Sequence, residues 1–429
     1  DVQGAQIDSD HLRGFEPEKK TMAIDILDLE AIVGYVKSAS RPVVLVGHGV
    51  RISGAVKSLL DFVERHKIPV VTSFLGIDVI DSRHPQYVGR IGIKGDRAGN
   101  LAVQNSDLLI TIGTSLPVAE IGYEYGQFAR EADIIVVDID VSSHEKNTIS
   151  IARLIHADAK DFIERLSQML EKEKGLFDKK WLKKCISWRE RYPVCLPEYS
   201  KLKGRINIYH FMDKLSGKLN EKDVVVTDAG STFYAGSQAV KIKKGMRYIT
   251  SGGFATMGYS LPASIGASIA LGRRRVMCIT GDGSFQQNIQ ELQSVIHYKL
   301  PLKIFILNNE GYLSIRFTQE RYFNNRFLGE GPNSGVSFPD SEKVAKAYGI
   351  KFFKVSDNKK LDKTLDEVLK YDGPVICEVI TPKDQLIIPT VSSEKKEDGS
   401  MVSKPLEDMY PFLSREEFKK EMLIKPIDE

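Results

Sequence analysis

The sequence predicts an α/β protein made of two doubly wound, mainly parallel sheet domains, and two observations support this fold class. Short apolar runs typical of buried strands alternate with helical patterns, as expected when helices cover both faces of a parallel sheet. The alternation stops in one stretch rich in charge and proline and then begins again, so the 429-residue chain carries the pattern twice. This length is sufficient for two or three domains of about 150 residues each.

Four apolar runs in the first half are expected to form buried strands of the first sheet. They are PVVLVG (42–47), IPVVTS (68–73), DLLITIG (107–113) and DIIVVDID (133–140). Helical patterns lie between the runs, for example GAVKSLLDFVERH (54–66) and DRAGNLAVQN (96–105). This order predicts a Rossmann-like domain.

The charge- and proline-rich stretch (173–205) is interpreted as a linker, and the strand pattern restarts after it. The expected strands of the second sheet are DVVVTDAG (223–230), RRVMCITGDG (274–283), LKIFILNNEG (302–311) and PVICEVIT (374–381). We expect FQQNIQELQSVIHY (285–298) to form a helix. Residues 391–429 include SSEKKEDGS and are expected to be an extension on the surface.

Composition excludes several classes of protein. The 60 lysines and arginines nearly balance 57 acidic residues, so the net charge of +3 gives no field that would attract nucleic acid. No apolar stretch approaches the roughly 20 residues of a membrane span, and we expect no membrane partner. Four scattered cysteines without CxxC spacing argue against a zinc knuckle and predict a cytoplasmic protein.

The segment ITGDGSFQQNIQEL (279–292) contains the first candidate site. It follows a predicted buried strand, and parallel sheets bind ligands at the carboxyl ends of their strands. Gly281 and Gly283 let the backbone turn tightly, and the start of a following helix favours a phosphate. Because the Asp282 carboxylate would repel a phosphate, we expect Mg²⁺ between them. A lone GDG also occurs in ordinary turns.

A second motif supports a metal site at Asp282. Asn309 ends the next predicted strand and follows Asp282 by 27 residues, the span of one helix plus one strand. The two loops should therefore be neighbours at one sheet edge. There the Asn309 amide oxygen and the main-chain carbonyl of Gly311 can complete an oxygen shell. The alternative is that the paired asparagines cap a turn.

GDGS followed by LNNEGY resembles the cofactor motif of thiamine diphosphate enzymes, which begins with GDG and ends with NN. The resemblance implies that Asp282, Asn309 and the Gly311 carbonyl hold Mg²⁺. It implies cofactor contacts for four further residues of the two motifs, namely Gly281, Gly283, Ser284 and Tyr312.

Two more segments resemble the acetolactate synthase branch of this family. SGGFATMGYSLPASIGA (251–267) is similar to the stretch that holds the aminopyrimidine, with Met257 as the apolar wedge that bends the cofactor and Ala255 offering its carbonyl in place of a glycine. DAGSTFYAG (228–236) is similar to the remaining diphosphate-binding turn, formed by Gly230, Ser231 and Thr232. A core methionine and a plain helix N-cap are the structural alternatives.

The resemblance covers nearly the whole chain and implies its domain organisation. Residues 22–172 are expected to form the central domain and residues 206–390 the thiamine diphosphate- and Mg-binding domain. Residues 1–21 are similar to the linker after a pyrimidine-binding domain, which carries the glutamate that protonates the ring in this family. That domain is expected to lie outside this sequence. We therefore expect no catalytic acid or base among these residues, and no turnover by this chain alone.

The central domain differs from that of FAD-binding relatives. The glycine turn GHGVRISG (47–54) is a weak dinucleotide signal, and the stretch after IGTSLP lacks their paired aspartates and arginine. We predict thiamine diphosphate and Mg²⁺ as cofactors, without FAD. His48 and Arg51 are interpreted as exposed loop residues rather than nucleotide ligands.

The family chemistry implies decarboxylation of a 2-ketoacid followed by carboligation to a second small carbonyl substrate. Thr318 stands where biosynthetic acetolactate synthases have a tryptophan, which predicts an acceptor other than that of branched-chain synthesis. A simple 2-ketoacid decarboxylase or C–C lyase, or a noncatalytic nucleotide-binding homologue, is the alternative. We expect a homodimer or homotetramer, in which the pyrimidine-binding domain belongs to the full-length or partner chain.

Overall fold

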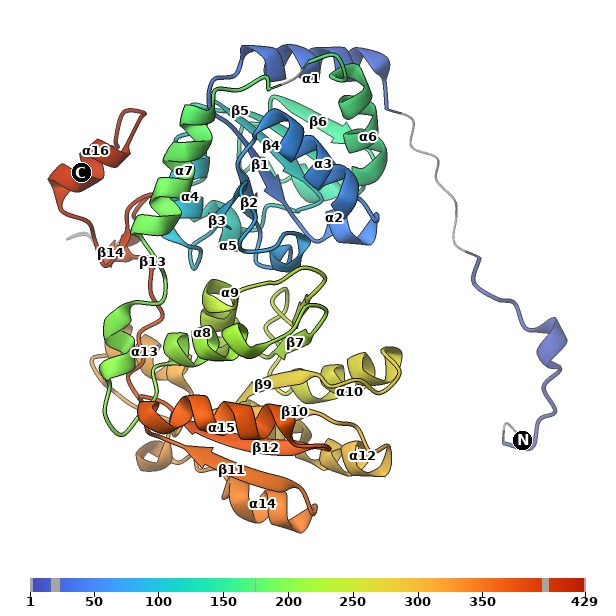
Figure 1. Cartoon of the computed structure of the whole chain (residues 1–429), viewed down its shortest axis with the longest axis vertical. Helices are drawn as coiled ribbons and strands as arrows, with labels where there is room; N and C mark the ends of the chain where they lie inside the picture. The colour runs from blue at the N-terminus through green and yellow to red at the C-terminus, as the bar shows by residue number, and fades with distance from the viewer. Residues whose placement is uncertain (1–2, 17–23, 174, 396–400, 428–429) are drawn as a thin grey trace.

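The computed structural model describes residues 3–16, 24–173, 175–395 and 401–427. They include two six-stranded sheets, one above the other in Figure 1, each covered by helices. Every pair of neighbouring strands in both sheets is parallel. The predicted fold class, two doubly wound parallel sheets, is therefore confirmed.

The first sheet has the strand order β3-β2-β1-β4-β5-β6. Its strands are β1 (Pro42–Val46), β2 (Val70–Thr72), β3 (Tyr87–Arg90), β4 (Leu108–Ile112), β5 (Asp133–Asp138) and β6 (Arg153–His156). Its helices are α1 (Ile26–Ser38), α2 (Gly49–Ile52), α3 (Val56–His66), α4 (Arg97–Gln104), α5 (Val118–Ile121) and α6 (Ala159–Met169). All four strands expected in this half are present, and β3 and β6 are additional.

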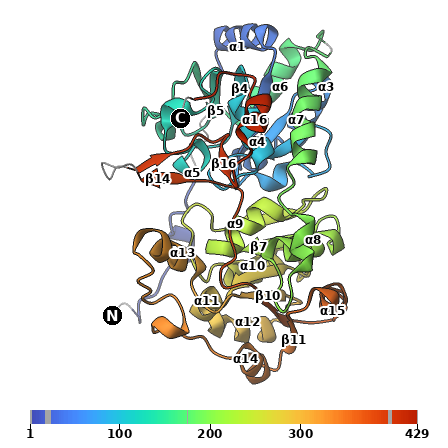
Figure 2. The same ribbon diagram turned by 90° about the vertical axis from the view of Figure 1, so that its left-hand side faces the viewer.

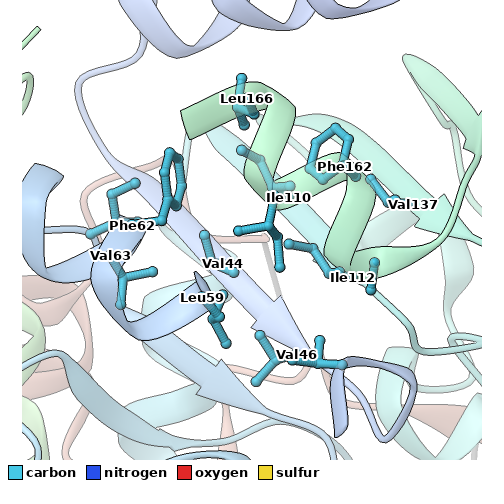
Figure 3. Packing of buried hydrophobic residues seen from close by; sticks show 14 of the residues in the cluster. Val44, Val46, Leu59, Phe62, Val63, Ile110, Ile112, Val137, Phe162 and Leu166 are labelled. Carbon is cyan, nitrogen blue, oxygen red and sulfur yellow. The ribbon is translucent and has the colours of Figure 1, made fainter. Parts of the chain in front are cut away.

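Apolar side chains of the sheet and of helices that include α1, α3 and α6 form one core cluster of the first domain, part of which is drawn in Figure 3. In α3 the buried residues recur at helical spacing, so that one face of the helix lies on the sheet. The central residues of this core are Val44, Val46, Ile110 and Ile112 from the strands, Leu59, Phe62 and Val63 from α3, and Phe162 and Leu166 from α6.

The second sheet has the strand order β11-β12-β10-β9-β7-β8. Its strands are β7 (Val224–Thr227), β8 (Arg247–Thr250), β9 (Met277–Gly281), β10 (Lys303–Asn308), β11 (Lys351–Val355) and β12 (Val375–Ile380). Its helices are α8 (Ile208–Lys218), α9 (Gly230–Ala239), α10 (Ser260–Ala270), α11 (Asp282–Phe285), α12 (Leu292–His297), α13 (Leu313–Tyr322), α14 (Ser341–Ala347) and α15 (Asn358–Lys370).

The single helix expected over 285–298 is wrong. After α11 the chain forms a 3-10 helix, Gln286–Glu291, in which Asn288 has a non-helical φ of −135°, and only then enters α12. The Asn288 side-chain amide donates a hydrogen bond to the Gly258 carbonyl at 2.8 Å. The kink is therefore tied to a second loop at the same edge of the sheet.

The stretch interpreted as a linker contains a packed helix, α7 (Lys179–Arg191). Trp181, Cys185 and Trp188 recur on one face of α7 and are buried against the first domain. The Trp181 indole also donates to the Pro42 carbonyl at 2.9 Å. Much of this stretch therefore belongs to the first domain.

The C-terminal segment returns to the first domain, as its red ribbon shows in Figure 2. It contains β13 (Thr390–Val391), β14 (Ser393–Lys395), β15 (Met401–Ser403), β16 (Met409–Tyr410) and α16 (Arg415–Glu421). Glu407 and Met409 are fully buried, and Asn100 of α4 donates to the Leu406 carbonyl at 2.8 Å. The prediction of a surface extension is wrong here, because this segment covers an apolar face of the first domain.

The two domains are joined by a buried carboxylate. Asp78, after β2, accepts from Arg51 Nε at 2.7 Å and from Arg247 Nε at 2.8 Å, and its side chain has no exposed surface. The Tyr248 amide of β8 also donates to Asp78 at 3.0 Å. Arg51 is thus a half-buried interface residue, not the exposed loop residue expected, and His48 contacts the Leu75 carbonyl at 3.2 Å.

No helix in the described ranges has the length and apolar content needed to cross a membrane. The four cysteines are unpaired.

Candidate functional site

Two adjacent strands of the second sheet bring the candidate metal residues together. β9 ends at Gly281 and β10 at Asn308, and Gly281 pairs with Leu307 in the parallel register. The loops that follow therefore start at the same edge of the sheet. They are hydrogen-bonded to each other, because the Asp282 Oδ2 accepts from the Gly311 amide at 3.1 Å.

Asp282 is a buried carboxylate with only 7% of its surface exposed. Burial raises its pKa to about 6, and hydrogen bonds from the Gly311 and Gly283 amides partly offset this rise. A charged carboxylate in such a place is costly unless a cation or further donors approach it. The electrostatics of the site therefore favour a bound cation.

Asn309 carries the second oxygen that a metal could use. Its side chain is 3% exposed, and its Oδ1 is buried without a hydrogen-bond partner among the described residues. An orphaned acceptor of this kind destabilises a fold by about 1–3 kcal/mol unless a ligand satisfies it. A buried carboxylate and an unpaired amide oxygen in two adjacent loops fit Mg²⁺, which prefers oxygen donors. The described ranges contain no cluster of three or more His, Cys, Asp or Glu that could hold a metal. The candidate site instead combines one carboxylate with amide and main-chain oxygens.

The backbone directly after Asn309 has positive φ angles, and one arginine, Arg316, holds it in place. Glu310 has a φ of 58° and Gly311 a φ of 151°. The Arg316 guanidinium donates to the carbonyls of Asn309 at 3.4 Å and Glu310 at 3.1 Å, and it pairs with Glu330 at 2.5 Å. Arg316 was not identified from the sequence, because its partners are mostly main-chain atoms.

The side chain of Glu310 secures the loop from the other side. Arg205 and Lys383 pair with its carboxylate at 2.8 and 2.5 Å. Hydrogen bonds from Lys383 and Arg205 lower the pKa of Glu310. The 309–311 loop, which we name the metal loop after its predicted role, is therefore held by charged residues from three parts of the chain.

The predicted diphosphate residues lie at the starts of two helices. Gly230 begins α9 with a φ of 59°, Ser231 and Thr232 are buried, and the Thr232 hydroxyl donates to the Ala229 carbonyl at 2.9 Å. At the GDG turn, a Cβ on Gly283 would lie 2.3 Å from the Tyr312 ring, so only glycine fits beneath it. Ser284 is buried at the same turn.

The predicted aminopyrimidine loop lies more open. Ala255 is exposed with a φ of 54°, and its amide donates to the Ser251 carbonyl at 2.7 Å. Met257 is half-buried, and the Gln287 amide approaches its thioether sulfur at 3.8 Å. This loop therefore contacts the kinked 3-10 helix after the GDG turn.

Two family models match the chain. The thiamine pyrophosphate enzyme central domain matches residues 29–166, and the thiamine pyrophosphate enzyme C-terminal TPP binding domain matches residues 228–379. Together they cover well over half of the sequence. The chain belongs to the thiamine pyrophosphate enzyme family. The second match includes the GDG turn, the Asn309 loop and the turn at Gly230.

Relatives of this thiamine pyrophosphate enzyme chain include acetolactate synthase large subunits. That of Cyanidium caldarium is 30% identical over 90% of this chain and 66% of its own length. That of Porphyra purpurea is 31% identical over 84% of this chain and 60% of its own length. The isozyme 2 large subunit of Escherichia coli (strain K12) is 30% identical over 82% of this chain and 62% of its own length. The chain thus spans about 60–66% of these relatives.

A further acidic residue connects the turns of the thiamine pyrophosphate enzyme motif. The Asp228 carboxylate is buried and accepts from the Ser260 hydroxyl at 2.8 Å, the Thr280 hydroxyl at 3.0 Å and the Tyr259 amide at 3.3 Å. Burial raises its pKa, and the bonds from Ser260 and Thr280 oppose this rise. Its position directly after β7, at the ligand edge, was the sequence signal that could have identified it.

Proposed function

We propose that this chain supplies the diphosphate- and metal-binding half of a thiamine diphosphate site, in an enzyme that decarboxylates a 2-ketoacid and joins the product to a second carbonyl. The unpaired Asn309 oxygen, in a loop bonded to the buried Asp282 carboxylate, is the observation that carries this proposal. The family match and the printed names of the relatives support the reaction class.

The proposed roles follow from where each residue lies. Mg²⁺ is held by Asp282, Asn309 and the Gly311 carbonyl. The diphosphate is held by the helix starts at Gly230, Ser231 and Thr232, and at Gly281, Gly283 and Ser284, whose free amides suit an anion. The Ala255 carbonyl and Met257 are proposed to orient the aminopyrimidine, with Tyr312 beside the GDG turn.

Bound thiamine diphosphate supplies a nucleophilic ring carbon and an electron sink for the charge left by CO₂. The chain's own part is to orient that ring and keep the charged end out of water. Asp228 contributes by fixing Ser260 and Thr280 relative to the turn at Gly230. Arg316 contributes by holding the carbonyls of the metal loop.

We further propose the domain division expected from the sequence, with residues 22–172 as central domain, against which α7 packs, and 206–390 as cofactor domain. Thiamine diphosphate chemistry also needs a group that protonates the pyrimidine. We propose that a pyrimidine-binding domain of the same or a partner chain supplies it, in a homodimer or homotetramer, and that these 429 residues alone have no turnover. The four unpaired cysteines are compatible with a cytoplasmic location.

Calorimetric titration with thiamine diphosphate, in Mg²⁺ and in EDTA, tests the proposal. We expect binding in Mg²⁺, none in EDTA, and a loss of about tenfold or more in affinity for Asn309→Ala. The variant should fold normally, because it removes an unsatisfied buried acceptor. Asn333→Ala, at an exposed position of the same domain, is the matched control. If the affinity for thiamine diphosphate is the same in Mg²⁺ and in EDTA, and is unchanged in Asn309→Ala, the metal assignment is refuted.

A further inference from the structure

A large pocket lies at the far end of α13 from the metal loop. Its volume is about 590 Å³. Arg321, Tyr322 and Asn324 line it from the end of α13, and Thr390 and Tyr410 line it from the C-terminal segment. None of these residues takes part in the proposed cofactor contacts. We name this cavity the Arg321 pocket.

Two cations near this pocket lack acidic partners. Arg321 is exposed and forms no ion pair within the described ranges. Lys94, between β3 and α4, is half-buried, and its Nζ lies 3.4 Å from the Ile387 carbonyl and 5.7 Å from the centre of the Tyr234 ring. No described carboxylate pairs with Lys94. Lys94 lies near the pocket, because it contacts the carbonyl of Ile387 and the preceding residue, Leu386, lines the pocket. Burial, and secondarily the charge of Arg321, lower the pKa of Lys94 to about 8.

Lys94 is a half-buried cation without a described carboxylate partner, and an anion bound beside it would compensate for its lost hydration. Resting on the proposed function, we propose that the Arg321 pocket binds the anionic group of a carbonyl substrate, with Arg321 and Lys94 as its counter-charges. Tyr322, Tyr410 and Asn324 supply neutral hydrogen-bonding groups around it. Guanidinium and ammonium groups both bind phosphate and carboxylate well, so the pocket selects for negative charge.

The position of the pocket indicates which carbonyl compounds would reach it. α13 starts at Leu313, directly after the metal loop, and Arg321 follows eight residues later, about 12 Å along the helix axis. Ser314 and Thr318 are exposed, and with Arg321 they recur at i, i+4 and i+7 on one face of α13. The side chains of Ser314 and Thr318 are small, so they add little bulk to this face.

Lys94 approaches the same site from the first domain. The ammonium group of Lys94 lies over the ring of Tyr234. Tyr234 belongs to α9, the helix that begins at the predicted diphosphate turn at Gly230. A substrate spanning from the cofactor to both cations must carry its charge several bonds from its reacting carbonyl. Pyruvate, whose carboxylate adjoins the carbonyl, is too short to do so. The substrate class is therefore a longer carbonyl compound with a terminal phosphate or carboxylate.

Site-specific acetylation of Lys94 tests the inference without any cofactor. The full chain is treated with acetic anhydride at pH 8, and the rate at Lys94 is read by peptide mass spectrometry. Three compounds without a ketone or aldehyde group are added as probes of the pocket, namely glycerol 3-phosphate, 4-hydroxybutyrate and neutral glycerol. We expect at least one anionic probe to slow acetylation of Lys94 about threefold or more in a saturable manner, because charge-assisted bonds occupy its ammonium group. Exposed Lys346 serves as the internal reference.

The variant Arg321→Gln should abolish this protection, while Arg274→Gln, at an exposed site elsewhere in the second domain, should retain it. Stronger protection by glycerol 3-phosphate would identify a phosphate, and stronger protection by 4-hydroxybutyrate a carboxylate. The inference would be overturned if glycerol slowed the acetylation of Lys94 as much as the anions do, or if neither anion slowed it. It would also be overturned if the anions still slowed it in Arg321→Gln. None of these results depends on thiamine diphosphate binding, so the two proposals fail separately.

Discussion

At the scale of single residues, polar groups that destabilise the fold gather at the ligand edge of the second sheet. Asp282 is a buried carboxylate, and the Asn309 oxygen is buried without a partner. Asp228 is also buried, but three donors satisfy it. Asp228 can therefore position the turns in the free protein, whereas the Asn309 oxygen has no partner among the described residues and would gain one from the proposed metal.

The sequence was sufficient to predict that the loops carrying Asp282 and Asn309 lie at the same edge of the sheet. Continuous apolar runs fix β9 and β10 as buried parallel strands, and their carboxyl ends must then share an edge. Arg316 could not be predicted in the same way. Its role depends on the positive φ of Glu310 and on carbonyl directions, which side-chain patterns do not determine.

Glu120 gives a pH-dependent prediction at this scale. Burial raises its pKa from 4.5 to about 7, opposed by a hydrogen bond from Thr114 and the charge of Lys146. Between these pH values the folded state binds a proton that the unfolded state has released, so the free energy of unfolding falls as pH rises. Glu120→Gln removes this slope and should be more stable than the wild type by up to about 3 kcal/mol at pH 8.

At pH 5 the two proteins should differ little, since Glu120 is then protonated when folded. Urea unfolding at both pH values measures the difference. Exposed Glu145→Gln is the control and should show no such change. If Glu120→Gln changes the free energy of unfolding equally at pH 5 and pH 8, Glu120 does not have a raised pKa in the folded protein.

At the scale of elements, the central strands of both sheets were predictable and the edge strands were not. β11, at one edge of the second sheet, has only one fully buried residue, and β6, at one edge of the first, also has one. Such strands lack the continuous apolar run that identifies a strand covered on both faces. The kink at Asn288 was hidden for another reason, because it depends on a hydrogen bond to Gly258, distant in sequence.

The C-terminal segment shows how a polar stretch can be part of a core. Glu407 is fully buried and accepts from Arg130 at 2.8 Å and from Gln104 at 2.6 Å. We predict that Glu407→Ala lowers the free energy of unfolding by about 3 kcal/mol, because it leaves a largely buried arginine without its carboxylate.

Chemical denaturation monitored by tryptophan fluorescence suits this measurement, since Trp181 and Trp188 lie in the same hydrophobic cluster as Met409. Glu416→Ala is the control from the same segment. Glu416 forms an exposed i, i+4 pair with Lys420, and its loss should change stability by less than about 0.5 kcal/mol. Similar losses in both variants would show that the segment contributes little through its buried charge.

At the scale of the whole molecule, the Arg321 pocket and the proposed cofactor site depend on how the two domains are held together. Lys94 belongs to the first domain and Arg321 to the second, so a change in domain orientation would separate them. Asp78 is the main charged link, because its carboxylate pairs with an arginine from each domain. The Arg90 guanidinium adds a bond to the Val240 carbonyl at 2.6 Å.

We therefore predict that Asp78→Asn loosens the domain interface without unfolding either domain. The amide group of the variant keeps an acceptor for Tyr248 but removes the charge that both arginines share. Hydrogen exchange at β8 should accelerate by at least about tenfold, as expected when local opening requires less free energy. Exchange in the buried strands β4 and β10 should stay unchanged. Asp61→Asn is the matched control, since exposed Asp61 pairs with Lys57 of its own helix, α3. If both variants accelerate exchange at β8 equally, the link at Asp78 does not control domain orientation, and the geometry of the Arg321 pocket must be maintained by the C-terminal segment instead.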